Sequence, residues 1–132
     1  MARLAAPRRP GFSLVELIVV LLVVGVLVGL AMPRFHSYRR KAYVATLVSD
    51  LRNLAAAEES FWNAAKSYSA DTAALNLTTS PGVSLTLVSA DSTGWSASAT
   101  HAGDPTACSI FYGSAPPLPP AEKENVIGCS GK

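Results

Sequence analysis

Charged side chains are scarce in this chain, and they are distributed unevenly along it. Aspartate, glutamate, lysine and arginine make up 15% of the 132 residues, whereas hydrophobic residues make up 49%. Residues 1–41 hold seven basic side chains and one acid, while residues 42–132 hold four basic side chains and eight acids. This division excludes an evenly basic nucleic-acid-binding surface, and so apolar a composition excludes disorder over the whole length.

Cysteine and histidine are also rare, with two of each. Two cysteines are too few for a small disulfide-rich protein, and without nearby histidines they make a poor zinc site. The histidines, His36 and His101, stand far apart, and no glycine-rich phosphate loop, HExxH motif or GxSxG motif occurs. We therefore expect a protein that is not an enzyme and that has no cofactor and no metal site.

One long apolar run is present, from Phe12 to Met32, and only Ser13 and Glu16 in it are polar. As a helix, its 21 residues would span about 30 Å, the thickness of the hydrocarbon core of a bilayer. A core helix of so small a protein could not bury apolar side chains on every side. A secretory signal peptide would be shorter and would end in a cleavage site of small residues. The run therefore predicts a membrane helix.

Glu16 is the unusual residue of this segment. A carboxylate inside a bilayer costs at least a few kcal/mol, so such residues generally have a partner or a function. One interpretation is that Glu16, which lies close to the start of the run, reaches the membrane surface. The alternative is a cationic partner that becomes available on assembly, and cleavage after Gly11 would create one, the amino group of Phe12.

The segment from Gly11 to Leu17 (GFSLVEL) follows a short basic leader and precedes the apolar helix. This signature resembles the processing site of type IV pilins and of the related type II secretion pseudopilins. The resemblance implies removal of residues 1–11 by a prepilin peptidase and N-methylation of Phe12. It also implies that Glu16 pairs with the Phe12 amine of a neighbouring copy when the chains polymerise into a type IV pilus.

Further partners and the cellular location follow from the same resemblance. The precursor is expected in the inner membrane, in contact with lipid and with its head outside the cytoplasm, and the mature chain in a pilus at the cell surface. An ATPase and an inner-membrane platform would drive assembly. Direct binding of nucleic acid by the head is not expected, because residues 69–132 contain only two lysines against five acids.

Two other functions remain open at this stage. The chain is also consistent with a type II secretion pseudopilin or a low-abundance minor pilin, which abundance in sheared surface filaments would distinguish. The remaining alternative is a monomeric, membrane-anchored binding module.

Three residues mark a candidate hinge. Gly25 and Gly29 weaken the apolar helix and form a small-xxx-small pattern that allows close helix approach. Pro33 lacks the N–H of a helical hydrogen bond. In filaments of the resembling family, the helix between such a glycine and such a proline tends to be unwound, so Gly25–Pro33 is the expected hinge.

Helical periodicity resumes beyond the hinge. Glu58 falls on this apolar stripe without an evident reason, whereas Asp50 falls off it, and the helix is expected to end at about Tyr68. The stripe recurs at spacings of three, four and seven residues and consists of Val44, Leu47, Val48, Leu51, Leu54, Ala55, Phe61, Trp62 and Ala65.

The remaining sequence predicts a loop and then a small sheet. Residues 69–82 are rich in turn-forming types, and from Val83 the apolar period changes to two. Residues 102–105 are expected to break the strands, and the proline-rich segment 115–121 is an extended connector. The predicted fold is therefore α+β, a long helix packed against an antiparallel sheet. Its expected parts are the leader 1–11, the membrane helix 12–32, the amphipathic helix 33–68, the loop 69–82 and the C-terminal region 83–132.

Cys108 and Cys129 enclose the proline-rich connector. In an oxidising compartment their pairing would contribute about 3 kcal/mol. Many pilins carry a disulfide-bounded loop near the C-terminus, whereas the major pseudopilins instead carry acidic calcium ligands. Glu122 and Glu124 are the acids nearest this position, but no DxDxDG-like run surrounds them. The cysteine pair therefore favours the pilus over the secretion system.

Overall fold

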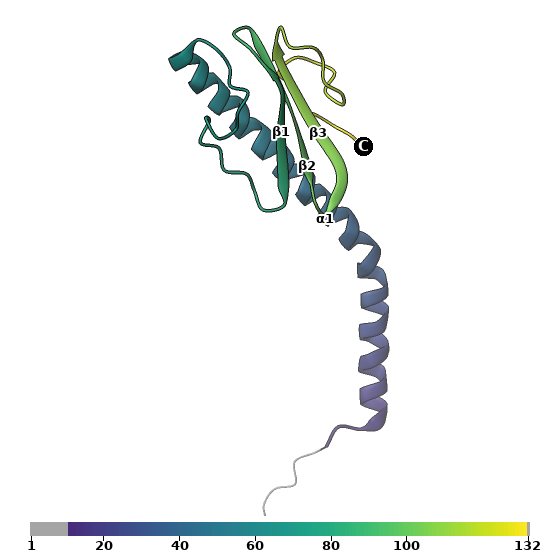
Figure 1. The fold of residues 1–132 in the computed structure, drawn as a ribbon. Coiled ribbons are helices and arrows are strands. Elements are labelled where there is room, and N and C mark those ends of the chain that lie inside the picture. The colour runs from purple at the N-terminus through teal and green to yellow at the C-terminus, as the bar shows by residue number, and fades with distance from the viewer. Residues whose placement is uncertain (1–10, 132) are drawn as a thin grey trace, which may run out of the picture. The chain divides into compact units, whose positions relative to one another are not determined.

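The computed structural model describes residues 11–131, apart from the side chains of residues 33 and 34. The chain forms two compact units, which meet between Ser37 and Tyr38. Helix α1 (Leu14–Ala65) begins in the first unit and ends in the second. The second unit also holds four strands, labelled from β1 onward in Figure 1. They are β1 (Val83–Ala90), β2 (Gly94–His101), β3 (Asp104–Gly113) and β4 (Gly128–Cys129).

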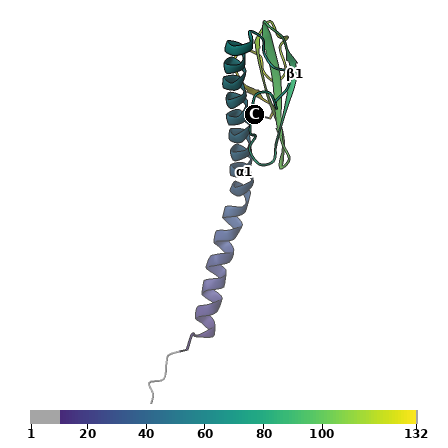
Figure 2. The same ribbon diagram turned by 60° about the vertical axis from the view of Figure 1, so that its left-hand side comes forward.

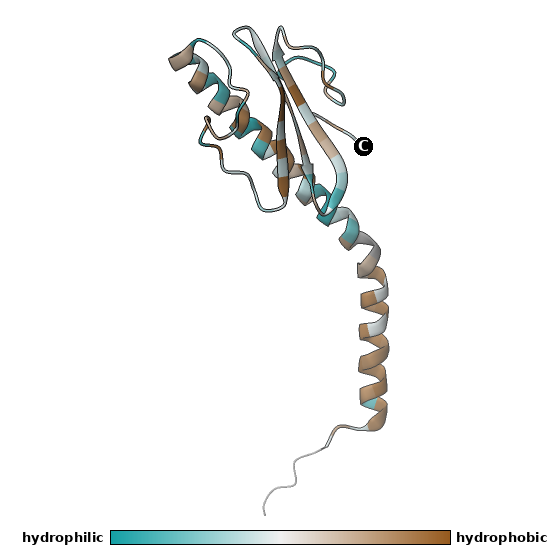
Figure 3. Ribbon diagram, viewed as in Figure 1, coloured by the Kyte–Doolittle hydropathy of each residue, from teal (hydrophilic) through white to brown (hydrophobic). Residues whose placement is uncertain are grey.

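The first unit is the apolar part of α1. Figure 3, which colours the ribbon by hydropathy, shows this stretch almost entirely in the brown of hydrophobic residues. Its described side chains are exposed within the chain, and the exposed fractions of the large apolar ones in the helix run from 49% at Val23 to 73% at Leu14. The segment therefore gains nothing from burial in its own chain, and its helix needs an apolar environment that the chain itself does not provide.

The second unit packs the rest of α1 against one face of the sheet, as Figures 1 and 2 show from two directions. Neighbouring strands are antiparallel and follow one another in the order β1-β2-β3-β4. The inward alternation of Val83, Leu85 and Leu87 that the sequence predicted is confirmed by their half-buried side chains. The α+β fold is thus confirmed.

The core of this unit lies between α1 and the two central strands. Leu47, Leu51 and Leu54 are completely buried, at the spacing of four and then three residues that the helical stripe predicted. They share one cluster with small residues of β2, Ala97 and Ala99, which are also fully buried. Small side chains on the sheet leave room for leucines on the helix, so the two layers pack closely.

Two boundaries of the prediction were wrong. Helix α1 ends at Ala65 rather than at about Tyr68, because Lys66 adopts a left-handed conformation with φ of 57°, a common way for a helix to end. Strand β3 begins at Asp104, inside the segment expected to break the strands. The pairing jumps from His101↔Asp104 to Thr100↔Ala107, so Pro105 lies in a bulge, where a missing N–H costs no ladder hydrogen bond.

The proline-rich connector covers part of the outer face of the sheet, which the sequence did not predict. Phe111 on β3 forms a second small buried cluster with Ala115 and Ala121, the two ends of the connector. The Ser109 hydroxyl donates to the Leu118 carbonyl at 2.7 Å and accepts from the Ala121 N–H at 3.0 Å. The connector is therefore an ordered part of the second unit.

Two buried carboxylates of α1 hold the two ends of the loop that links the helix to β1. Glu58 is fully buried, and its Oε2 accepts the Ser69 N–H at 2.9 Å, which explains why an acid occupies the apolar stripe. Asp50 is only 3% exposed, so its placement off the stripe was wrong. Its two oxygens accept the Ser80 N–H and hydroxyl at 2.7 and 2.9 Å. Both ends of the loop are thus fastened to one helix.

Candidate assembly site

The residues of the predicted processing signature lie at the start of α1 and just before it. Gly11, Phe12 and Ser13 are not helical, and the helix begins at Leu14. The Ser13 carbonyl accepts the first helical bond, from Leu17 N–H at 3.1 Å, and Glu16 Oε2 lies 3.4 Å from the Ser13 nitrogen. The contact of the Glu16 side chain with the backbone nitrogen of Ser13, the N-cap residue, is half of a capping box. The S-x-x-E spacing that is typical of a capping box was present in the sequence.

This geometry gives Glu16 a weak partner inside its own chain. A neutral N–H at 3.4 Å is a long hydrogen bond, and it does not neutralise the carboxylate. Phe12 is 79% exposed, and the peptide bond between Gly11 and Phe12 precedes the helix. The rest of the predicted leader, residues 1–10, lies outside the described residues.

The helix that follows is long and apolar enough to cross a membrane by length and composition. None of its most apolar stretch is buried inside the chain. Gly25 and Gly29 face open space, because a Cβ added at either would meet no atom within 4 Å. Residues 25–33 are helical throughout, so unwinding of the hinge at Gly25, Gly29 and Pro33 stays a prediction about the filament.

The two cysteines that the sequence singled out form a disulfide. Cys108 on β3 and Cys129 on β4 are paired directly across the two strands, with Cα atoms 4.0 Å apart. Cys108 is completely buried in the main core. The bond therefore ties the C-terminal segment to the core of the sheet.

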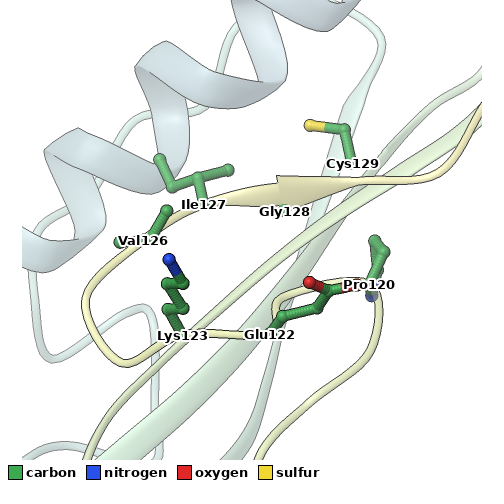
Figure 4. A pocket seen from close by; sticks show the side chains of 7 residues that line it. All are labelled: Pro120, Glu122, Lys123, Val126, Ile127, Gly128 and Cys129. Atoms are coloured by element: carbon green, nitrogen blue, oxygen red, sulfur yellow. The ribbon is translucent and has the colours of Figure 1, made fainter. Parts of the chain in front are cut away.

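A shallow cavity of about 290 Å³ lies beside this bond, between the connector and β4 (Figure 4). Its lining joins an apolar side, including Val126 and Ile127, to the charged side chains of Glu122 and Lys123. Glu124 is not among its lining residues, and its Oε1 accepts the Gly113 N–H at 2.9 Å. Among the described residues, no three His, Cys, Asp or Glu side chains come together as a metal site would require.

The two histidines lie in different units. His36 is exposed on the first, while the His101 ring stacks on Tyr43 in the second, with centroids 4.1 Å apart. His101 Nδ1 accepts the Gly103 N–H at 2.9 Å. Its ring therefore helps to pack the β2–β3 turn onto α1.

Comparison with known proteins identifies the N-terminal signature. Residues 7–32 match the model of the prokaryotic N-terminal methylation motif. Over 63 residues the chain is 32% identical to the type IV major pilin protein PilA of Myxococcus xanthus (strain DK1622). That stretch is 48% of this chain and 29% of the relative, so the chain matches less than a third of the relative's length. The motif, this similarity and the helix-and-sheet fold together support the type IV pilin, or prepilin, family for this chain.

Proposed function

We propose that this chain is a prepilin that is cleaved after Gly11, methylated on the nitrogen of Phe12 and polymerised through α1 into a type IV pilus. The observation that carries the proposal is the exposed apolar surface of the first unit with one carboxylate, Glu16, at its start. Such a surface requires lipid or other protein around it. A carboxylate at this position requires a cation.

Before assembly, lipid covers the apolar helix. The precursor then lies in the inner membrane with its second unit outside the cytoplasm, and the mature chain lies at the cell surface in the filament. Extraction from lipid exposes the apolar helices, which repack against one another. The ATPase and the inner-membrane platform supply the work.

Within the filament, Glu16 selects the register of neighbouring copies. Its weak hydrogen bond to the Ser13 N–H leaves the negative charge uncompensated. An ionised carboxylate in a dry helical core is strongly unfavourable unless a cation and further hydrogen bonds satisfy it. Removal of residues 1–11 by the prepilin peptidase supplies that cation, the Phe12 amine, and clears the space that the leader would occupy.

The ordered disulfide at Cys108 and Cys129 favours a pilus over a secretion pseudopilus. It fastens the short strand β4 to β3 and so supports a C-terminal segment that has little apolar material of its own. A major pilin would be abundant in filaments sheared from the cell surface, and a minor pilin or a pseudopilin would not.

The role of Glu16 is tested by two substitutions. Glu16→Val removes both the charge and the hydrogen-bond acceptor, whereas Glu16→Gln removes the charge and keeps an acceptor for the Ser13 N–H. We expect both variants to insert into the membrane and neither to form filaments at the wild-type yield. Val20→Leu, a neutral change on the same helix, is the matched control and should assemble normally. Wild-type yield from Glu16→Gln would show that helix capping, and not charge pairing, is what assembly requires.

A further inference from the structure

Three consecutive cations, Arg39, Arg40 and Lys41, occupy the beginning of the second unit. They follow the apolar run from Phe12 to Met32 closely, with only six residues between Met32 and Arg39. As a helix, the chain from Met32 to Arg39 rises only about 10 Å. Lysine and arginine usually gather at the cytoplasmic end of a membrane span. The proposed pilus function places the cytoplasm at the opposite end of the apolar run, so that preference does not explain these cations.

The first of these cations, Arg39, contacts an aromatic side chain. The Arg39 guanidinium donates to the Tyr43 hydroxyl at 3.1 Å and lies 6.0 Å from the centre of the Tyr43 ring. The same ring also stacks on His101. Gly103 is also close, because a Cβ added there would lie 3.2 Å from the Tyr43 ring. Arg39 is thus oriented by a packed tyrosine.

The second cation, Arg40, interacts with groups of its own unit. Arg40 donates to the Gly131 carbonyl and so links α1 to the C-terminal segment. Hydrogen bonding by Thr106, whose N–H donates to Asp104 Oδ1 at 2.8 Å, lowers the pKa of Asp104, and the charges of Arg40 and His101 lower it further. Arg40 is thus engaged within the second unit, by its bond to the C-terminal segment and by its proximity to the acid of the β2–β3 turn.

The third cation is available to an outside partner. Lys41 is exposed, and its side chain makes no hydrogen bond or ion pair with any residue in the range 11–131. Tyr38, three residues before it, is 64% exposed. Exposed tyrosines beside lysine and arginine at the end of an apolar span are typical of the headgroup layer of a membrane.

We propose that Arg39, Lys41 and Tyr38 form a contact for the phosphate headgroups of anionic lipids, which holds the second unit at the membrane until the subunit is extracted. This inference rests on the proposed membrane stage of the pilin. Lipid is favoured over nucleic acid because the contact adjoins the apolar span, whereas the rest of the second unit is acidic.

Lysine offers the most direct test, because each described lysine except Lys41 is an internal control. The full-length chain, labelled with ¹⁵N at lysine Nζ, is reconstituted in bilayers of phosphatidylcholine alone or mixed with phosphatidylglycerol. Solid-state NMR then measures the proximity of each Nζ to lipid ³¹P, and Lys41→Gln identifies the Lys41 signal. We expect ³¹P contact at Lys41 in the anionic bilayer and none at Lys66 or Lys123.

A second measurement gives the size of the effect. Spin-labelled lipids report the preference of the inserted chain for phosphatidylglycerol over phosphatidylcholine, which should fall about fivefold for each cation removed. Arg39→Gln with Lys41→Gln is the test variant. Arg52→Gln, which removes an exposed arginine farther along α1, is the control and should leave the preference unchanged.

The other possible outcomes distinguish failure of this inference from failure of the proposed function. A chain that inserts but shows no ³¹P contact at Lys41 would overturn this inference and leave the proposed function standing. A chain that does not insert at all would overturn both. If inorganic phosphate added to neutral bilayers reproduced the contact, or if DNA bound the wild type but not the double variant without lipid, the assignment to anionic lipid would be wrong.

Discussion

Replacement of Asp50 by alanine should destabilise the second unit by about 3 kcal/mol. The Asp50 carboxylate is 3% exposed and accepts two hydrogen bonds from Ser80, at 2.7 and 2.9 Å. Each hydrogen bond to a charged group contributes about 1.5–3 kcal/mol, and the alanine variant leaves both Ser80 donors without their partner. Ser80→Ala removes only the hydroxyl bond, so its expected cost is about 1–2 kcal/mol.

Urea unfolding of the detergent-solubilised chain, followed by tryptophan fluorescence, measures these differences, because Trp95 is only 2% exposed in the core. Asn53→Ala, an exposed change on the same helix, is the control and should stay within about 0.5 kcal/mol of the wild type. A double-mutant cycle of Asp50→Ala with Ser80→Ala isolates the coupling between the two residues. An Asp50→Ala variant as stable as the Asn53→Ala control would refute the claim that this carboxylate fastens the loop.

Three further predictions concern the same chain. Burial raises the pKa of the Glu58 carboxyl more than its bond from Ser69 lowers it, so its stabilising contribution is present at low pH and is lost as the pH rises through the raised value. Glu58→Gln cannot ionise and should lose less stability than the wild type as the pH is raised above the ordinary range of a glutamate carboxyl in urea titrations; parallel losses would contradict this. Cys108→Ser with Cys129→Ser should lower the free energy of unfolding by about 3 kcal/mol while leaving membrane insertion intact, and equal stability under oxidising conditions would count against the constraint. Gly11→Trp should leave the full-length precursor in the membrane on immunoblots, and normal processing would disprove the leader assignment.

The periodic parts of the fold could be predicted because local rules govern them. Leu47, Leu51 and Leu54 lie on one helical face at any length of helix, and Val83, Leu85 and Leu87 share one face of any strand. The pilin-type fold and the disulfide followed from the signature at the N-terminus and from the positions of the two cysteines.

The features that could not be predicted depend on partners far away in the sequence. Asp50 lies three residues after Leu47 and four before Leu54, so its helical phase is that of the buried face. The group that allows a carboxylate to be buried there, Ser80, comes 30 residues later in the sequence. Pro105 is tolerated in β3 because a bulge in the pairing with β2 removes the need for its N–H. The order of the 115–121 connector likewise depends on Ser109, which no local pattern connects to it.

One local pattern in the sequence allowed two interpretations. The Ser13-x-x-Glu16 spacing is a helix-capping pattern as well as part of the processing signature. In the chain by itself Glu16 caps the helix weakly, and its proposed pairing with a neighbouring Phe12 belongs to the assembled state.

Surface fibres sheared from the source cells provide the most direct measurement, by electron microscopy and by mass spectrometry of the intact subunit. The proposed pilin function predicts thin filaments whose subunit begins at Phe12, carries one methyl group on the nitrogen of that residue and contains the Cys108–Cys129 bond. A chain that keeps its first eleven residues, stays in the membrane and is missing from every fibre would contradict it.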